Sequence, residues 1–288
     1  MAHSDVASVT FFCPTLDVCS SRLVIALAMC GSSCRATPIA KPQGLPGPRH
    51  GLEPVNNNLL LEISVESLSS AVAAERGGAH RIELCEYLAV GGVTPSEQLM
   101  RDTRAAVKLP IFAMIRPRDE DFVYSGSELA RMRDEISLAK SCGMDGLVFG
   151  ILNPDDTINV QQTRELVGLA RPLPVTFHRA FDVTPDLHTA LESVIATGAR
   201  RILTSGGKPS AFLGASVLGD LVRAANCRIK ILPGAGINAA NLSDIIRLTG
   251  ASEFHSGLGT TLPYGQSSSA AFQGGVRELT EILAATCA

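Results

Sequence analysis

From about residue 59 onward, short apolar runs alternate regularly with amphipathic stretches. The runs are rich in β-branched and aromatic residues, as buried strands are. Eight such runs begin near Leu59, Arg81, Ile111, Gly146, Val175, Arg201, Ile229 and Glu253. Strands that alternate with helices predict a parallel sheet, and eight repeats predict a closed barrel. We therefore expect residues 58–288 to form one α/β domain, a (β/α)8 barrel of the TIM type.

Signals at the helix ends agree with this interpretation. Glycines at positions 78, 143, 198 and 250 follow predicted helices and stand just before predicted strands. Glycine relaxes the left-handed turn in which many helices end. Ser125 and Glu128 have the spacing of a capping box, which predicts a helix start at that point.

Polar residues recur with a period of two inside several predicted strands. The strands of a closed parallel barrel are covered on both faces, so they normally read as apolar throughout. The exceptions are Glu62 and Ser64, Arg81, Glu83 and Cys85, Met114 and Arg116, Thr176 and His178, and Glu253 and His255. Residues at i and i+2 share a strand face, so these side chains converge on the barrel axis if that face points inward. They would then form either a layer of buried ion pairs or a ligand site.

Position along each strand separates these two alternatives, because the site of such a barrel lies at the carboxyl-terminal ends of its strands. Glu62 and Arg81 lie near the starts or middles of their strands, so we expect them to be structural. Residues 174–182 (PVTFHRAFD) instead pass from an apolar strand into a polar cluster that contains His178 and Asp182. That pattern predicts a functional site at the end of the fifth strand.

The candidate catalytic residues are Glu83, Arg116, His178, Asp182, Glu253 and His255. His178 is a candidate general acid or base, with its tautomer fixed by Asp182 or Glu83. Arg116 would hold a carboxylate or phosphate, and Glu253 with His255 would form a second acid–base pair. These groups favour an enzyme that acts on a small anionic metabolite. No nucleophile elbow, Schiff-base signature or dinucleotide fingerprint identifies the reaction, and we expect no nucleotide cofactor.

Two glycine-rich turns follow the sixth and seventh predicted strands, at residues 204–207 (TSGG) and 233–236 (PGAG). Glycine lets backbone N–H groups approach an anion closely, and barrels of this kind often hold phosphate or carboxylate near their last strands. The residues expected to bind such a group are Ser205, Gly206, Gly234 and Gly236.

Composition excludes several other classes of protein. The chain has 25 basic and 28 acidic residues, without a basic run, so nucleic acid is not an expected partner. No apolar run reaches the roughly 20 residues that a membrane-spanning helix requires. The eight cysteines form no C-x-x-C zinc pattern and the chain is too long to need a disulfide scaffold, which favours reduced thiols in the cytoplasm.

The first 57 residues differ in composition from the rest, being rich in Ser, Cys, Pro and Gly. Residues 42–51 (PQGLPGPRHG) have the composition of a linker. We interpret residues 1–57 as a poorly ordered or processed extension outside the barrel. If it acts as a transit peptide, the protein would be organellar rather than cytoplasmic.

Several motifs, taken together and in order, resemble the CutC family, which is named for copper homeostasis. They are residues 74–79 (AERGGA), 81–85 (RIELC), 91–95 (GGVTP), 115–118 (IRPR), 121–125 (DFVYS), 175–182 (VTFHRAFD), 202–206 (ILTSG), 234–236 (GAG) and 253–256 (EFHS). The resemblance implies a barrel of this type, a cytosolic setting, an association with copper handling and self-association into a homo-oligomer.

The resemblance also implies a copper(I) site, with Cys85 and Met114 as its candidate ligands here. Copper(I) is soft and favours thiolate and thioether ligands. Family members commonly carry a cysteine in the first strand, where this chain has Ser64. Met114, His178 or Cys85 of a second copy would have to replace it. A second departure is the segment at residues 257–275, which is shorter than the family's usual loop.

Three functions therefore follow from the sequence. The first is copper homeostasis with copper(I) bound at Cys85, and the second is the enzyme acting on a small anionic metabolite. The third is a divalent-metal site built from Glu83, His178 and Glu253, since imidazole and carboxylate suit zinc or manganese.

Overall fold

The computed structural model describes residues 59–258 and 269–286. The predictions for residues 1–57, and most of the segment after Ser256, lie outside these ranges. Within them, no helix has the length and apolar character needed to cross a membrane.

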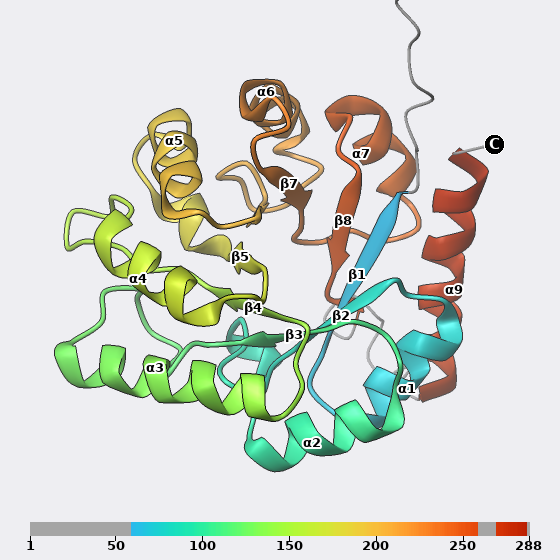
Figure 1. Ribbon diagram of the computed structural model, residues 1–288. Helices are drawn as coiled ribbons and strands as arrows, with labels where there is room; N and C mark the ends of the chain where they lie inside the picture. The colour runs from blue at the N-terminus through green and yellow to red at the C-terminus, as the bar shows by residue number, and fades with distance from the viewer. Residues whose placement is uncertain (1–58, 259–268, 287–288) are drawn as a thin grey trace, which may run out of the picture. The chain divides into compact units, whose positions relative to one another are not determined.

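Parallel strands form the centre of the described chain (Figure 1). They are β1 (Leu60–Val65), β2 (Arg81–Leu84), β3 (Ile111–Met114), β4 (Gly146–Phe149), β5 (Val175–Phe177), β6 (Arg201–Thr204), β7 (Lys230–Pro233) and β8 (Glu253–Ser256). Their hydrogen-bonded order is β7-β6-β5-β4-β3-β2-β1-β8, so the last strand pairs with the first. The predicted (β/α)8 barrel is confirmed, and its strands lie where the apolar runs were found.

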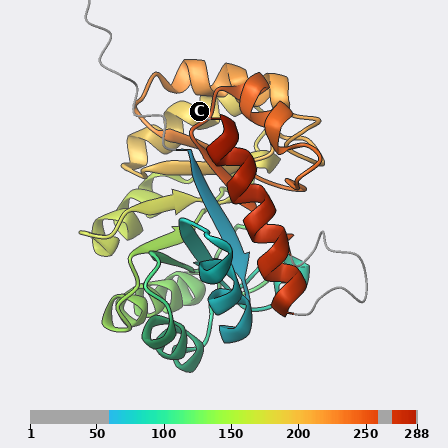
Figure 2. The same ribbon diagram turned by 90° about the vertical axis from the view of Figure 1, so that its right-hand side faces the viewer.

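Helices follow the strands and cover the outside of the barrel (Figure 1). They are α1 (Leu68–Gly77), α2 (Glu97–Ala106), α3 (Gly126–Ser141), α4 (Val160–Ala170), α5 (Leu187–Thr197), α6 (Ala215–Ala225), α7 (Leu242–Thr249) and α9 (Ser269–Thr286). Two 3₁₀ turns lie in the loops after β2 and β5, at Leu88–Val90 and Arg179–Val183. Helix α9 packs along α1 and beside β1 (Figure 2).

The predicted helix boundaries are also found. Ser125 and Glu128 form the capping box of α3. Gly78, Gly198 and Gly250 end α1, α5 and α7 in the left-handed conformation. Glycine adopts this conformation without the steric penalty of a Cβ atom.

The amino-terminal end of the barrel is closed by an aromatic ring and charged side chains. The guanidinium groups of Arg81 and Arg201 lie over the Phe112 ring, 4.8 and 5.1 Å from its centre. Both arginines pair with Glu253, at 2.9 and 3.0 Å. Gly146 leaves room for the ring, since a Cβ at that position would lie 2.5 Å from it. This packed layer leaves the opposite end of the barrel for a cavity.

Candidate functional site

A cavity of about 480 Å³ opens at the carboxyl-terminal ends of the strands. The predicted residues that line it are Glu83, Met114, Arg116, His178, Asp182, Gly236 and His255. Ser64 also lines it, so side chains that alternate along β1, β2 and β8 do face a common space. Cys85, Ser205, Gly206, Gly234 and Glu253 do not line it.

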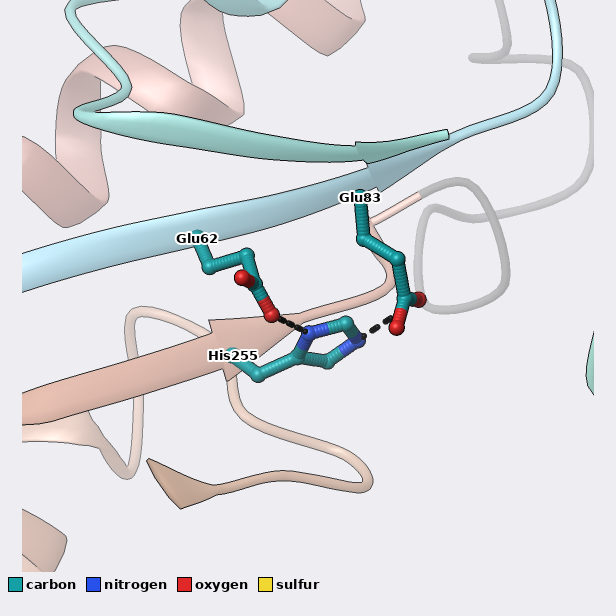
Figure 3. Close-up of side chains that lie close together, drawn as sticks. All are labelled: Glu62, Glu83 and His255. Carbon is teal, nitrogen blue, oxygen red and sulfur yellow. Dashed lines mark hydrogen bonds and ion pairs between the residues drawn. The ribbon is translucent and has the colours of Figure 1, made fainter. Parts of the chain in front are cut away.

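One wall of the cavity is built on three neighbouring strands, β1, β2 and β8 (Figure 3). Nδ1 of His255 lies 2.8 Å from Oε1 of Glu62. The other ring nitrogen, Nε2, lies 3.8 Å from Oε2 of Glu83. The remaining oxygen of Glu62 pairs with Nε of Arg81. Glu62 therefore fixes the imidazole so that Nε2 is directed at Glu83.

Burial and charge set the protonation of this wall. Burial raises the pKa of Glu83 to about 7, with a further contribution from the charge of Glu62. Burial alone would lower the pKa of His255, but the charge of Glu83 and the hydrogen bond to Glu62 raise it. Burial opposes ionisation of Glu62 as well, yet Arg81 and His255 hold the pKa of Glu62 far below its ordinary value. Two neighbouring groups with raised pKa values, Glu83 at about 7, suit acid–base chemistry near neutral pH.

His178 lies at the end of β5, against the rings of Phe122 and Phe177. Its Nδ1 accepts a hydrogen bond from the backbone N–H of Ala180 at 3.3 Å. Burial and the charge of Arg116 lower the pKa of His178 to about 3. The structure therefore differs from the sequence-based expectation: a backbone group, rather than Asp182 or Glu83, fixes the tautomer, and the ring stays neutral near pH 7.

Arg116 faces the cavity, but its terminal nitrogens are occupied by the protein itself. Nη1 donates to the carbonyl oxygens of Val90 and Gly92, at 3.1 and 3.0 Å. Nη2 donates to those of Asp119 and Glu120, at 2.6 and 3.0 Å. The guanidinium thus ties together the loops after β2 and β3. In this arrangement Nη1 and Nη2 cannot form the predicted bidentate hydrogen bonds with an anion, although the guanidinium still brings positive charge to the cavity.

The carboxylate of Asp182 occupies the glycine-rich turn after β6. It accepts hydrogen bonds from the N–H groups of Ser205 and Gly207, and from the hydroxyls of Ser205 and Thr204. The N–H of Gly206 donates instead to the Thr204 hydroxyl, at 2.9 Å. The donors expected to bind a ligand at Ser205 and Gly206 are therefore bound within the chain.

The second glycine-rich turn, after β7, has a packing role at Gly234. A Cβ at this position would lie 2.5 Å from the Leu203 side chain and 3.4 Å from His255. Gly234 thus permits His255 to lie close to β7. Gly236 adopts a positive φ of 70° and lines the cavity.

The predicted divalent-metal set is not brought together. Glu253 lies in the charged layer below the cavity, and the expected pairing of Glu253 with His255 is replaced by its ion pairs with Arg81 and Arg201. Ligand atoms of Glu62, Glu83 and His255 do lie within 4.8 Å of one another. Glu62 already binds His255 and Arg81, which leaves Glu83 and Nε2 of His255 as the free ligand atoms of this group.

Cys85 is fully buried beside Met114, in a small apolar cluster inside the barrel. Its Sγ donates a weak hydrogen bond to the carbonyl of Val65, at 3.7 Å. Burial, followed by the charges of nearby carboxylates, raises the pKa of Cys85 far above its ordinary value. The free protein therefore holds a protonated thiol, and of these two neighbours Met114 lines the cavity while Cys85 does not.

Sequence reasoning missed two features of the site. Glu62 was assigned a purely structural role, but it also orients His255; its alternation with Ser64 was the available signal. Phe122 lines the cavity between Arg116 and His178, with its ring centre 5.0 Å from the guanidinium carbon and 4.9 Å from the imidazole centre. Only its place in the DFVYS motif distinguished Phe122 in the sequence.

The fold and the site define a class of protein: a (β/α)8 barrel with ionisable side chains around a cavity at the carboxyl-terminal ends of its strands. A model of the CutC family matches residues 59–260. The chain belongs to the CutC family, as its motifs indicated.

Relatives and a solved structure agree with this assignment. A copper homeostasis protein cutC homolog from Mus musculus is 49% identical over 199 residues, which cover 69% of this chain and 73% of the mouse protein. The Homo sapiens homolog of the same name is 48% identical over the same shares of both chains. The crystal structure of a CutC protein from Streptococcus agalactiae has a TM-score of 0.66 and 33% identity, and the match covers 69% of this chain and 98% of that one.

Proposed function

We propose that this protein serves copper homeostasis and holds copper(I) between the sulfur atoms of Cys85 and Met114. Its mouse and human relatives are named for copper homeostasis. The observation that carries the proposal is that the side chains of Cys85 and Met114 both lie against Gly92. A Cβ built on Gly92 would lie 3.0 Å from Sγ of Cys85 and 3.7 Å from Cε of Met114. Thiolate and thioether are the ligands that copper(I) favours.

The charges around Cys85 support a cation at this place. Glu83, Glu66 and Glu86 all favour the protonated thiol. The same negative potential favours a copper(I) ion that takes the place of the thiol proton. Because Ser64 replaces the cysteine common in the family, the site has one thiolate, and we expect weaker binding than at a two-thiolate site. The cytoplasmic setting and the self-association stay predictions.

The test is a copper(I) titration of the reduced protein against a competing chelator. Cys85→Ser should abolish stoichiometric binding, and Met114→Leu should weaken it. Cys142→Ser is the matched control, because Cys142 is also a buried free thiol but lies at the end of α3. Binding that survives Cys85→Ser, or that Cys142→Ser removes equally, would refute the proposal.

The geometry of the cavity favours a second candidate function, an enzyme that transfers a proton to or from a small anionic metabolite. The relay from Glu62 through His255 to Glu83 carries this proposal, because it directs a ring nitrogen and a carboxyl group toward the cavity. Lys208 also lines the cavity and favours a negatively charged ligand, whereas Arg179 in the same lining is paired with Asp182 at 2.9 Å.

Exchange of solvent deuterium into pyruvate, followed by proton NMR, tests this second function. Pyruvate is a small carboxylate with exchangeable C–H protons next to a carbonyl group. Glu83→Gln should slow exchange by about 100-fold or more, the range of a lost acid–base group. Glu97→Gln is the control, since Glu97 is exposed on α2 and pairs with Arg101. Equal exchange by the wild type and Glu83→Gln would exclude Glu83 as the acid–base group.

A further inference from the structure

His178 presents a hydrogen-bond donor that the acid–base wall does not use. Its Nδ1 accepts the N–H of Ala180, so this nitrogen carries a lone pair and no proton. A neutral imidazole then carries its proton on Nε2. Nε2 is buried, has no hydrogen-bond partner among the described residues, and belongs to a side chain that lines the cavity.

The imidazole of His178 is held in one orientation by its neighbours. Phe122 and Phe177 pack against it, with ring centres 4.9 and 6.1 Å away. Gly150 lets the ring lie directly on the backbone, since a Cβ at that position would lie 2.8 Å from Nδ1. Rotation of the ring would also break the hydrogen bond to Ala180. The donor is therefore fixed in place before any ligand arrives.

A buried donor without a partner is less stable than one that is paired. A ligand oxygen that reaches Nε2 recovers this free energy, which an apolar or donor-only group cannot do. Arg116, on the other side of Phe122, and Lys208 in the cavity lining add positive charge to the same space, where Arg179 is paired with Asp182. Together these groups select a ligand with both an acceptor oxygen and a negative charge.

We propose that Nε2–H of His178 binds the carbonyl oxygen of a small oxo acid whose carboxylate is attracted by the cationic side chains of the cavity. This inference deepens the enzyme proposal and rests on it for the nature of the ligand. His178 acts as a neutral donor that polarises the carbonyl and does not exchange its own proton. Proton transfer belongs to the wall formed by Glu83 and His255.

Nitrogen NMR of histidine-labelled protein tests the donor directly, with pyruvate, glyoxylate and acetate as probes. We expect His178 to show the neutral Nε2–H tautomer throughout the neutral range and to shift on addition of pyruvate or glyoxylate. Acetate, which lacks the carbonyl, should shift it less. His188, which is exposed on α5, serves as the internal control. A protonated ring, the Nδ1–H tautomer, or no binding of any probe at millimolar concentration would overturn the inference.

Two variants separate the donor from the shape of the side chain. His178→Gln keeps an N–H donor, and pyruvate affinity should stay within about threefold of wild type. His178→Leu removes the donor, and affinity should fall by about tenfold, which corresponds to one hydrogen bond. Equal binding by His178→Leu overturns this inference, whereas deuterium exchange by that variant would leave the enzyme proposal standing. Pyruvate binding that depends on His178, without deuterium exchange, would support this inference and refute the enzyme proposal.

Discussion

Nδ1 of His255 lies 2.8 Å from Oε1 of Glu62, so the last strand of the barrel is joined to the first through side chains as well as backbone. Glu62 is fully buried and also pairs with Arg81. Glu62→Gln leaves the guanidinium with one fewer buried negative partner. The expected loss in the free energy of unfolding is about 3–5 kcal/mol, measured by urea denaturation.

Glu97→Gln, a substitution of the same type on the surface, is the control for the stability loss expected of Glu62→Gln. Glu97 forms an exposed pair with Arg101, so Glu97→Gln should change stability by less than about 1 kcal/mol. If the two variants were equally stable, the Glu62 network would not hold the barrel together.

Replacement of Glu83 should change how stability depends on pH. The pKa of Glu83 in the folded protein, about 7, is above its ordinary value of 4.5, so the folded state retains a proton that the unfolded state has lost. The contribution of Glu83 to wild-type stability should therefore fall as the pH rises through this interval, so the difference in stability between wild type and Glu83→Gln should change with pH in that direction. Denaturation curves at several pH values between the two pKa values measure it; parallel curves for both proteins would contradict the expectation.

His178 should act in the opposite direction. Its pKa in the folded protein, about 3, is below the ordinary value of 6.5, so below pH 6.5 the unfolded state binds a proton that the folded state excludes. The His178 contribution alone should lower wild-type stability by about 2 kcal/mol between neutral pH and about pH 5, at 1.36 kcal/mol for each pH unit. His178→Gln should not show this dependence, whatever its absolute stability. A slope that persists in the variant would have to come from other groups.

Removal of the Asp182 carboxylate should expose an anion site that the protein fills itself. Asp182→Ala frees the N–H groups of Ser205 and Gly207, so their amide hydrogens should exchange faster. The expected loss of stability is about 3 kcal/mol, because several buried donors lose one acceptor. Sulfate should raise the melting temperature of the variant more than that of wild type; an equal rise in both would show that the turn does not bind it.

Gly92 should not tolerate a side chain. Its φ is 83°, and a Cβ would lie 3.0 Å from Sγ of Cys85. Gly92→Ala should lower the free energy of unfolding by about 1–3 kcal/mol and disturb the proposed copper site. Gly126→Ala is the control, since it lies in α3 with no other atom within 4 Å of the added Cβ, and it should be neutral or stabilising by up to about 1 kcal/mol. Calorimetry of both variants measures the difference.

The sequence predicted the barrel because its signals are local. Apolar runs mark the strands, and the alternation of Glu62 with Ser64 indicated an inward face that contacts the cavity. The site was less predictable because its hydrogen bonds join distant segments. Most partners of Asp182 lie more than twenty residues away, in the turn after β6, and those of Arg116 are backbone carbonyls, which leave no trace in residue type. Glu253 lies at the start of β8, and this position could have predicted that it belongs to the charged layer at the amino-terminal end of the barrel.

The bond between Asp182 and the turn after β6 has a consequence for how a ligand binds. The turn after β6 is held by a carboxylate from the loop after β5, so it does not need a ligand to acquire its shape. An entering molecule therefore meets a preorganised wall and spends little binding free energy on ordering it.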